Sequence, residues 1–315
     1  MQKMICVCLV FFLPAGLVAA RDIFVNNAAG NDRFTGAQPR IFADTTGPVQ
    51  TLAKALRLAR AGDRIVLADT GQPYRDSLSL VGGRLSGLLR QPLVIDGGGA
   101  VLDGSAPVPR DQWEFYRDNR FRFRPPRMGS SQLFLDDRPA VRVSVAAAAD
   151  TPPKLEPRQW CAHEGYIYFG VELSKLPSDY RLSYASLPTG ITLYHVQNVV
   201  IKDLTVQGFQ TDGIDAQNSA EHVVLDQVIC RNNGRNGITV GGASQVEIRS
   251  CKVSGNGASQ LLTLPYCEVH LIKSELPGDS APAWKDEGGR VYLGDRPIRG
   301  GLETIRKEER MQNVK

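Results

Sequence analysis

The chain has 315 residues, of which 42% are hydrophobic and 22% are charged. This balance is typical of a chain that buries a large core, and it excludes an intrinsically disordered protein. The formal net charge of only +4 leaves no electrostatic footprint for nucleic acid, so we expect no nucleic-acid partner.

Residues 1–20 have the pattern of a signal peptide. Lys3 supplies the positive start, residues 5–13 form an apolar stretch, and the small residues 18–20 precede Arg21 as a cleavage site. The apolar stretch is too short to cross a bilayer as a helix, and no second candidate for a membrane span is present. The sequence therefore predicts an exported protein, secreted or periplasmic.

Residues 21–106 predict the N-terminal cap and first coils of a β-solenoid. A strand at 23–25 precedes a polar turn, residues 48–59 carry apolar side chains at helical spacing with Thr51 as N-cap, and a strand follows at 65–67. A helix at the end of a solenoid covers an apolar core and an unpaired strand edge. This order, with its Pro-x-x-Thr-Leu-x-x-Ala and Ala-Gly-Asp-x-Ile-x-Leu motifs, resembles the cap of secreted pectate-lyase-like β-helix proteins. Residues 92–104 continue the resemblance as the next coil.

Residues 107–186 interrupt this pattern and predict a small β-rich insertion, called the insertion below. Aromatic residues concentrate here, and strand-like pieces alternate with proline-rich connectors. The arrangement resembles an insertion found in many carbohydrate-active β-helix proteins, folded against one side of the solenoid. Its aromatic rings suit either the core of such a module or stacking on sugars, with Trp160 as the substrate-binding candidate. The arginines between 120 and 127 indicate a strand edge, a loop or a polyanion site.

Residues 187–276 form a repeat with a period of about 23 residues. One apolar series is spaced by 23, 24 and 23 positions and a second by 24, 23 and 23: Ile191, Ile214, Ile238 and Leu261, and then Val199, Val223, Val246 and Val269. Apolar residues alternate within each unit, turn residues separate the runs, and no unit has room for a helix. The fold class predicted is all-β, a right-handed parallel β-helix with three short strands per coil.

The pairing of two cysteines and the end of the solenoid each allow more than one interpretation. Cys230 and Cys251 fall in the inward third-strand series of successive coils, and export permits a disulfide, so they predict either a pair or two small buried apolar residues. Residues 277–315 lose the period and predict an irregular C-terminal segment, with one more strand at 290–293 and no evident cap.

The segment Thr-Asp-Gly-Ile-Asp at 211–215 resembles part of the active site of polygalacturonase-type glycoside hydrolases, with Gln210 where that family has Asn. One coil later the family carries paired aspartates, whereas this chain has Arg235 and Asn236, and the family's Gly-His-Gly has no counterpart. Asp212 and Asp215 remain as a carboxylate pair. Three strand residues span about 10 Å at most, which is compatible with an inverting acid and base. The same residues also suit plain turn chemistry.

A polysaccharide lyase would need a base together with a cation or hydrogen-bond donor that neutralises a uronate. Lys202 and Arg235 are among the basic candidates. Ca²⁺ is a cofactor only under this hypothesis, with oxygen ligands from Asp203, Asp212, Asp215 and Asp226 and no set singled out by spacing.

The outward side chains of the first strand series predict a groove for an extended polysaccharide. The candidate catalytic residues are Asp212, Asp215 and Arg235, and the candidate substrate-binding residues are Trp160, Asn236, Gln217 and Lys202. Three functions remain open: a polysaccharide lyase or hydrolase, which we favour, a non-catalytic glycan-binding protein, and an exported structural module. The sequence leaves the oligomeric state open.

Overall fold

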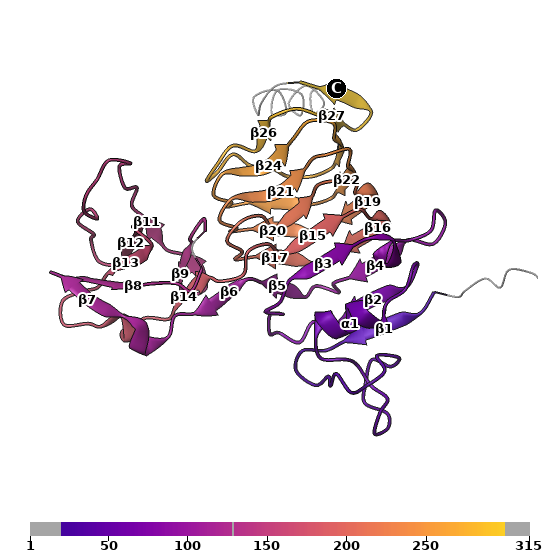
Figure 1. Cartoon of the computed structure of the whole chain (residues 1–315), viewed down its shortest axis with the longest axis horizontal. Helices are drawn as coiled ribbons and strands as arrows, with labels where there is room; N and C mark the ends of the chain where they lie inside the picture. The colour runs from indigo at the N-terminus through magenta and orange to yellow at the C-terminus, as the bar shows by residue number, and fades with distance from the viewer. Residues whose placement is uncertain (1–19, 128, 300–315) are drawn as a thin grey trace, which may run out of the picture.

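The computed structural model describes residues 20–127 and 129–299, and in these residues the chain forms a solenoid of stacked coils with a lateral module (Figure 1). The predicted signal peptide, except for Ala20, and residues 300–315 lie outside the described residues. Three parallel sheets run along the solenoid, one for each strand of a coil. This arrangement confirms the predicted parallel β-helix.

The first sheet has six strands, and its outward face becomes important below. They follow the order β26-β24-β21-β18-β15-β3: β26 (Trp284–Asp286), β24 (Ser259–Thr263), β21 (Asn236–Val240), β18 (Ile214–Ala216), β15 (Ile191–Tyr194) and β3 (Leu78–Val81).

The second sheet has nine strands and extends into the N-terminal cap. Its strands are β1 (Asp22–Val25), β2 (Arg64–Leu67), β4 (Leu93–Asp96), β16 (Gln197–Lys202), β19 (Glu221–Asp226), β22 (Gln245–Arg249), β25 (Glu268–Ile272), β27 (Arg290–Leu293) and β28 (Arg296–Ile298). The third sheet consists of β5 (Val101–Asp103), β17 (Thr205–Gln207), β20 (Ile229–Arg231) and β23 (Lys252–Ser254).

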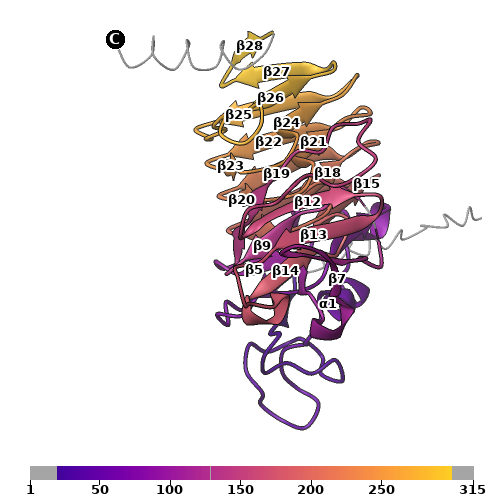
Figure 2. The ribbon, with the colours of Figure 1, turned by 90° about the vertical axis from the view of Figure 1, so that its left-hand side faces the viewer.

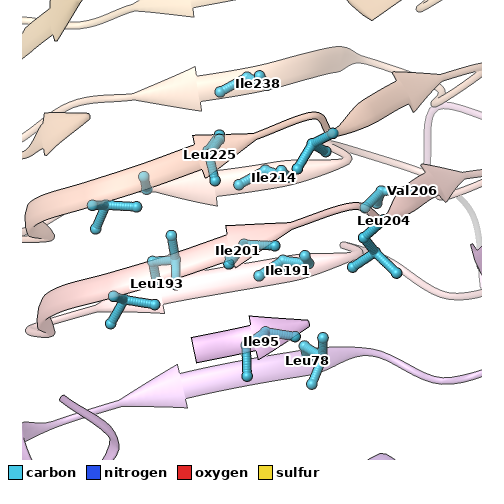
Figure 3. Packing of buried hydrophobic residues seen from close by; sticks show 14 of the residues in the cluster. Leu78, Ile95, Ile191, Leu193, Ile201, Leu204, Val206, Ile214, Leu225 and Ile238 are labelled. Carbon is cyan, nitrogen blue, oxygen red and sulfur yellow. The ribbon is translucent and has the colours of Figure 1, made fainter. Parts of the chain in front are cut away.

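Residues one repeat apart in the sequence pair in register on neighbouring coils. Ile191 pairs with Ile214, Ile214 with Ile238, and Ile238 with Leu261. The aligned valines of the second series pair in the same way along β16, β19, β22 and β25. Stacked Ile, Leu and Val side chains fill the interior between the sheets, as Figure 3 shows for Ile191, Ile214 and Ile238. Burial of this continuous apolar column supplies the main driving force for folding.

Helix α1 (Leu52–Leu58) lies in the N-terminal cap and contacts β1 and β3 (Figure 1). The Thr51 side chain accepts a hydrogen bond from the Lys54 N–H, so Thr51 is the N-cap that the sequence predicts. Leu52 and Ala55 are buried against the core. Three short 3₁₀ helices, Gly83–Leu85, Arg110–Gln112 and Pro177–Asp179, complete the helical content of the described residues.

The insertion leaves the solenoid after β5 and returns before β15, so it interrupts the passage from one coil to the next. Its strands form a four-stranded sheet of β6 (Ser105–Pro107), β14 (Leu182–Ala185), β9 (Leu133–Leu135) and β10 (Arg138–Pro139), and a five-stranded sheet of β7 (Glu114–Arg117), β8 (Arg120–Phe123), β13 (Tyr166–Gly170), β12 (Gln159–His163) and β11 (Val141–Arg142). The module projects sideways from the coils near the N-terminal end (Figure 1) and lies in front of them in Figure 2. Gln210 ties it to the solenoid by donating to the carbonyls of Arg127 and Ala185, both at 3.1 Å.

Strand β27 coincides with the strand that the sequence predicts at 290–293, but the rest of the described C-terminal segment is more regular than predicted. Leu261 pairs with Trp284 and Val269 with Val291, so β26 and β27 continue the first and second sheets beyond residue 276. Strand β28 then folds back antiparallel on β27. Strand β28 therefore pairs with the edge of β27 that no further coil covers in the described residues (Figure 2).

The cysteines of the solenoid are small buried side chains of the column. Cys230 pairs in register with Val253, whereas Cys251 accepts a hydrogen bond from the Val228 N–H at 3.4 Å. Among the described residues, Cys161, Cys230, Cys251 and Cys267 are all free thiols. This agrees with the second of the two interpretations from the sequence.

Candidate functional site

Alternation along the first sheet divides its side chains between the core and solvent. Ile214 points into the column, whereas Asp215 faces outward and pairs in register with Thr192 on one side and Thr239 on the other. The same row continues through Leu262 and Lys285. The outward row therefore crosses successive coils, as the sequence predicts.

Asp212 lies at the turn that enters β18 and is completely buried, with 0% of its surface exposed. Its carboxylate accepts hydrogen bonds from the Asn236 backbone N–H and side-chain Nδ2, both at 3.0 Å. It also accepts from Arg235 Nε at 2.9 Å and from Arg235 Nη2, a bidentate ion pair. Because these four donors occupy its oxygens, the Asp212 carboxylate holds Arg235 and Asn236 in place and is poorly placed to transfer a proton to a substrate.

Arg235 is the partly exposed member of this ion pair. Its side chain is 45% exposed, and the hydrogen bond to Asp212 raises the pKa of the guanidinium. The ion pair with Asp212 thus holds the guanidinium in its charged form, which makes Arg235 a poor base and a good partner for an anion. It is instead a fixed cation with a free edge toward solvent, suited to a carboxylate or hydroxyl group.

Asp215 differs from Asp212 in that its carboxylate is only partly buried. It accepts one hydrogen bond, from Gln217 Nε2 at 2.8 Å. Partial burial raises the pKa of the Asp215 carboxyl above its ordinary value of 3.8, and the nearby charge of Asp212 adds to the rise, against the lowering effects of Gln217 and Arg235. A carboxyl group shifted in this direction is suited to acid–base chemistry.

An open hollow of about 590 Å³ lies on the outward face of the first sheet next to these groups. Its lining runs from the residue after β18 and from β21 to the last coil: Gln217, Arg235, Asn236, Thr239, Ala258, Leu262, Leu264, Pro282, Lys285 and Glu287. Gln217 and Thr239, which line it, are also the hydrogen-bond and register neighbours of Asp215. The hollow therefore begins at the immediate neighbours of Asp215 and extends along the axis of the solenoid.

Sequence reasoning missed the C-terminal end of this hollow, where Lys285 and Glu287 form an ion pair. The signal was present: Trp284 follows Leu261 by 23 positions, one repeat. The repeat is hard to recognise here because a tryptophan replaces the usual aliphatic residue and prolines and glycines flank it. The Trp284 ring is nevertheless buried, and its Nε1 donates to Thr263 Oγ1 at 2.9 Å.

Two candidate residues lie elsewhere, and the structure corrects both. Trp160 is 0% exposed in the core of the insertion, where its Nε1 donates to the Ala140 carbonyl at 3.1 Å, so it cannot stack on a sugar. Lys202 lies on β16 in the second sheet and forms an ion pair with Asp96 at 2.9 Å. Its side chain is therefore on a different face of the solenoid from Asp215.

The aspartates considered as Ca²⁺ ligands are not brought together. Asp226 ends β19 in the second sheet, and Asp203, just after β16, donates its N–H to the Asp226 carbonyl. Asp215 lies on the first sheet, and Asp212 lies in the turn that enters it. The Asp212 oxygens are occupied by Arg235 and Asn236, so they do not fit a cation. In residues 20–127 and 129–299 no group of three or more His, Cys, Asp or Glu side chains could hold a metal ion.

Comparison with known proteins supports the fold. Residues 189–276 match the family model described as right handed beta helix region. No curated protein matches the chain. A solved structure described as a glycoside hydrolase superposes with a TM-score of 0.55 at 12% identity, covering 81% of this chain and 74% of that one.

Two further solved structures superpose less closely. The pectate lyase Pel9A has a TM-score of 0.41 at 13% identity, with 89% of this chain and 62% of that chain covered. A GH136 lacto-N-biosidase from Eubacterium ramulus has a TM-score of 0.39 at 13% identity, with 79% and 41% covered. No helix within the described residues is long and apolar enough to span a membrane. The chain has the right-handed parallel β-helix fold, and residues 189–276 form its right-handed β-helix region.

Proposed function

We propose that this protein acts on an extended acidic polysaccharide bound along the outward face of the first sheet, with Asp215 as the proton-transferring residue. The observation that carries the proposal is the partly buried Asp215 carboxyl, of raised pKa, beside the hollow and the fixed guanidinium of Arg235. A solenoid face suits a linear polymer because neighbouring strands, about 4.8 Å apart, repeat the same surface along the axis.

The side chains present favour β-elimination over hydrolysis. An inverting or retaining glycoside hydrolase needs two carboxyl groups that face the scissile bond, and Asp212 is occupied by Arg235 and Asn236. β-Elimination from a uronic acid needs one base and one group that neutralises the sugar carboxylate. In this proposal Asp215 and Arg235 fill these two roles.

The proposed step transfers one proton and breaks one bond. The Asp215 carboxylate takes the proton from C5 of a uronate residue, whose carboxylate is held by Arg235. The C4–O bond then breaks, its electron pair leaves on the oxygen of the departing sugar, and a C4=C5 double bond forms. The departing oxygen takes its proton from the Asp215 carboxyl or from water.

The test is an activity screen of residues 21–315 on acidic and neutral polysaccharides. Ultraviolet absorbance detects the unsaturated uronate of an elimination, and reducing ends detect either reaction. We expect unsaturated product that is lost, by about 100-fold or more, in Asp215→Asn, as for removal of a general acid or base. The matched control Asp226→Asn, an outward carboxylate on the second sheet, should retain activity. Reducing ends without unsaturated product would replace this proposal with a hydrolase.

A non-catalytic glycan-binding protein is the second candidate, and one observation favours it. Only Asp215 of the two motif carboxylates is available to a substrate, and the family's second acidic pair is replaced by Arg235 and Asn236. Under this alternative the purified protein releases no product from any polymer, and it retains an acidic polysaccharide on a binding column with Arg235→Ala weakening the retention.

We further propose that the protein is exported and that its mature chain begins at Arg21. The support is the signal-peptide pattern of residues 1–20. The Arg21 backbone nitrogen lies 3.2 Å from Asp63 Oδ1, so cleavage before it would place a charged α-amino group beside a buried carboxylate. N-terminal sequencing of the exported protein should read Arg-Asp-Ile. Retention of the uncleaved chain in the cytoplasm would contradict the proposal.

A further inference from the structure

A second hollow lies between the solenoid and the insertion, away from Asp215. It measures about 340 Å³, within the range of small-molecule sites. The solenoid contributes Arg75, Asp103 and Gln207 to its lining, and the insertion contributes Asp137 and Arg181. A smaller adjoining hollow shares Asp103, Asp137 and Gln207. We call these five residues and the space between them the lateral cleft.

The solenoid wall of the lateral cleft is fixed by hydrogen bonds along the third sheet. Asp103 is nearly buried and accepts from the Ser105 N–H at 2.8 Å and from Gln207 Nε2 at 3.0 Å. Gln207 Oε1 accepts in turn from Arg231 Nε at 2.9 Å. Arg75 donates to Ser105 Oγ at 3.1 Å. These polar groups are held in place before any ligand arrives, which lowers the entropic cost of binding.

The insertion wall is a tight turn held against the same space. Asp137 has φ of 60° in the turn between β9 and β10, and it forms an ion pair with Arg181 at 2.7 Å. The Asp136 N–H donates to the Arg181 carbonyl at 3.0 Å, which joins the turn to the start of β14. The side chains of Arg181 and Asp137 remain 73% and 58% exposed, so both can reach a ligand.

We propose that the lateral cleft binds neutral sugar residues of the polysaccharide, as a site separate from Asp215. Arg181 pairs with Asp137, and Arg75 lies 3.8 Å from Asp103. Asp69 adds a third carboxylate to the lining, so the cleft has no excess of cationic groups that would hold a polyanion. The cleft contains both donors, on Arg75 and Arg181, and acceptors, on Asp103 and Asp137, and a sugar hydroxyl is both donor and acceptor. The proposal rests on the proposed function for the class of ligand, and it adds that the substrate carries neutral residues recognised by the insertion.

The experiment is a calorimetric titration of the full mature chain carrying Asp215→Asn, which leaves the sugars unconsumed. The probes are cellohexaose, xylohexaose and mannohexaose, with hexagalacturonate as the charged comparison. We expect saturable binding of at least one neutral probe. Arg181→Ala, and Asp137→Asn, in which asparagine tolerates the positive φ, should each weaken that binding about tenfold, the loss expected for a charge-assisted hydrogen bond. Lys252→Ala, an exposed cation on the third sheet outside the cleft, is the matched control.

The outcomes separate this proposal from the proposed function. The lateral cleft is supported if Arg181→Ala and Asp137→Asn both weaken binding and the ligand protects residues 133–139 from hydrogen exchange. This support holds even when the wild-type protein releases no product. Absence of binding by every neutral probe overturns it, as does binding that neither variant changes or binding of hexagalacturonate alone. Activity that depends on Asp215 would then survive as an independent result.

Discussion

The two aspartates of the Thr-Asp-Gly-Ile-Asp segment are three residues apart in the sequence and have different environments. Asp212 is buried and surrounded by donors, whereas Asp215 accepts one hydrogen bond beside an open hollow. Alternation along the strand cannot distinguish them, because Asp212 lies in the turn before β18. These environments support the proposed division, in which Asp212 positions its neighbours and Asp215 transfers the proton.

Substitution of each aspartate should therefore affect stability differently. Asp212→Asn removes one charge of a buried ion pair, a change that usually costs about 3–5 kcal/mol of stability. We expect a loss of about 3 kcal/mol in the free energy of unfolding, because Arg235 is half exposed. Asp215→Asn should leave that free energy unchanged or raise it slightly at neutral pH, because the surroundings of Asp215 disfavour its charged form. Urea unfolding followed by circular dichroism measures both. Equal losses in the two variants would contradict the assignment.

The pH dependence of stability gives a further check on Asp215. Its pKa is raised on folding, so the native state binds more protons than the unfolded state between the ordinary value of 3.8 and the raised value. The contribution of Asp215 to stability therefore falls as the pH rises through this window. Asp215→Asn should remove that fall, as seen in the difference between the two unfolding curves measured at successive pH values.

At the scale of the elements, the turn between the third and first sheets repeats with the coils. Asn233 donates from its backbone N–H and its Nδ2 to Asn256 Oδ1, both at 3.0 Å, so the two side chains form a ladder 23 positions apart. In the preceding coil Gly213 lies directly before β18 of the first sheet. A Cβ built on Gly213 would lie 2.1 Å from Cys230 Sγ, which leaves no room for a side chain.

Gly213→Ala should consequently destabilise the protein by about 1–3 kcal/mol, the usual cost of overpacking. The matched control is Gly83→Ala, since a Cβ on Gly83 meets nothing within 4 Å. This control should be neutral or slightly stabilising, because alanine restricts the unfolded chain. Thermal unfolding of both variants measures the difference. A Gly213→Ala variant as stable as the control would show that the turn relaxes easily.

At the scale of the whole molecule, the last coil completes both the core and the candidate site. Strands β26 and β27 cover the edges of β24 and β25, and Lys285 and Glu287 line the hollow. A chain ended after Leu276 would expose two parallel strand edges and the apolar end of the column. We expect this truncation to aggregate or to unfold at a lower temperature. A chain ended after Arg299, which keeps all the described strands, should behave like the full-length protein in the same light-scattering and melting measurements.

The periodic part of the fold was predictable because it is local. Each unit of about 23 residues repeats the same alternation of apolar side chains, and stacking such units is the way they bury their apolar faces. The helix capped by Thr51 was predictable for the same reason, since its signals lie within a few residues. The cluster of Asp212, Asp215, Arg235, Asn236 and Gln217 followed from the same repeat, because a register of one coil brings residues 23 or 24 positions apart side by side.

The tertiary structure decided what the repeat does not encode. Trp160 could belong to a core or a surface, and its burial depends on how the insertion folds against itself. Lys202 was placed on a different face by the corners between sheets, and the last coil was hidden by proline and glycine around Trp284. The lateral cleft joins residues 75 and 181 across the insertion, and such a long-range contact leaves no pattern in a single sequence. Local periodicity determined the solenoid, whereas packing between distant segments decided which side chains are free to meet a ligand.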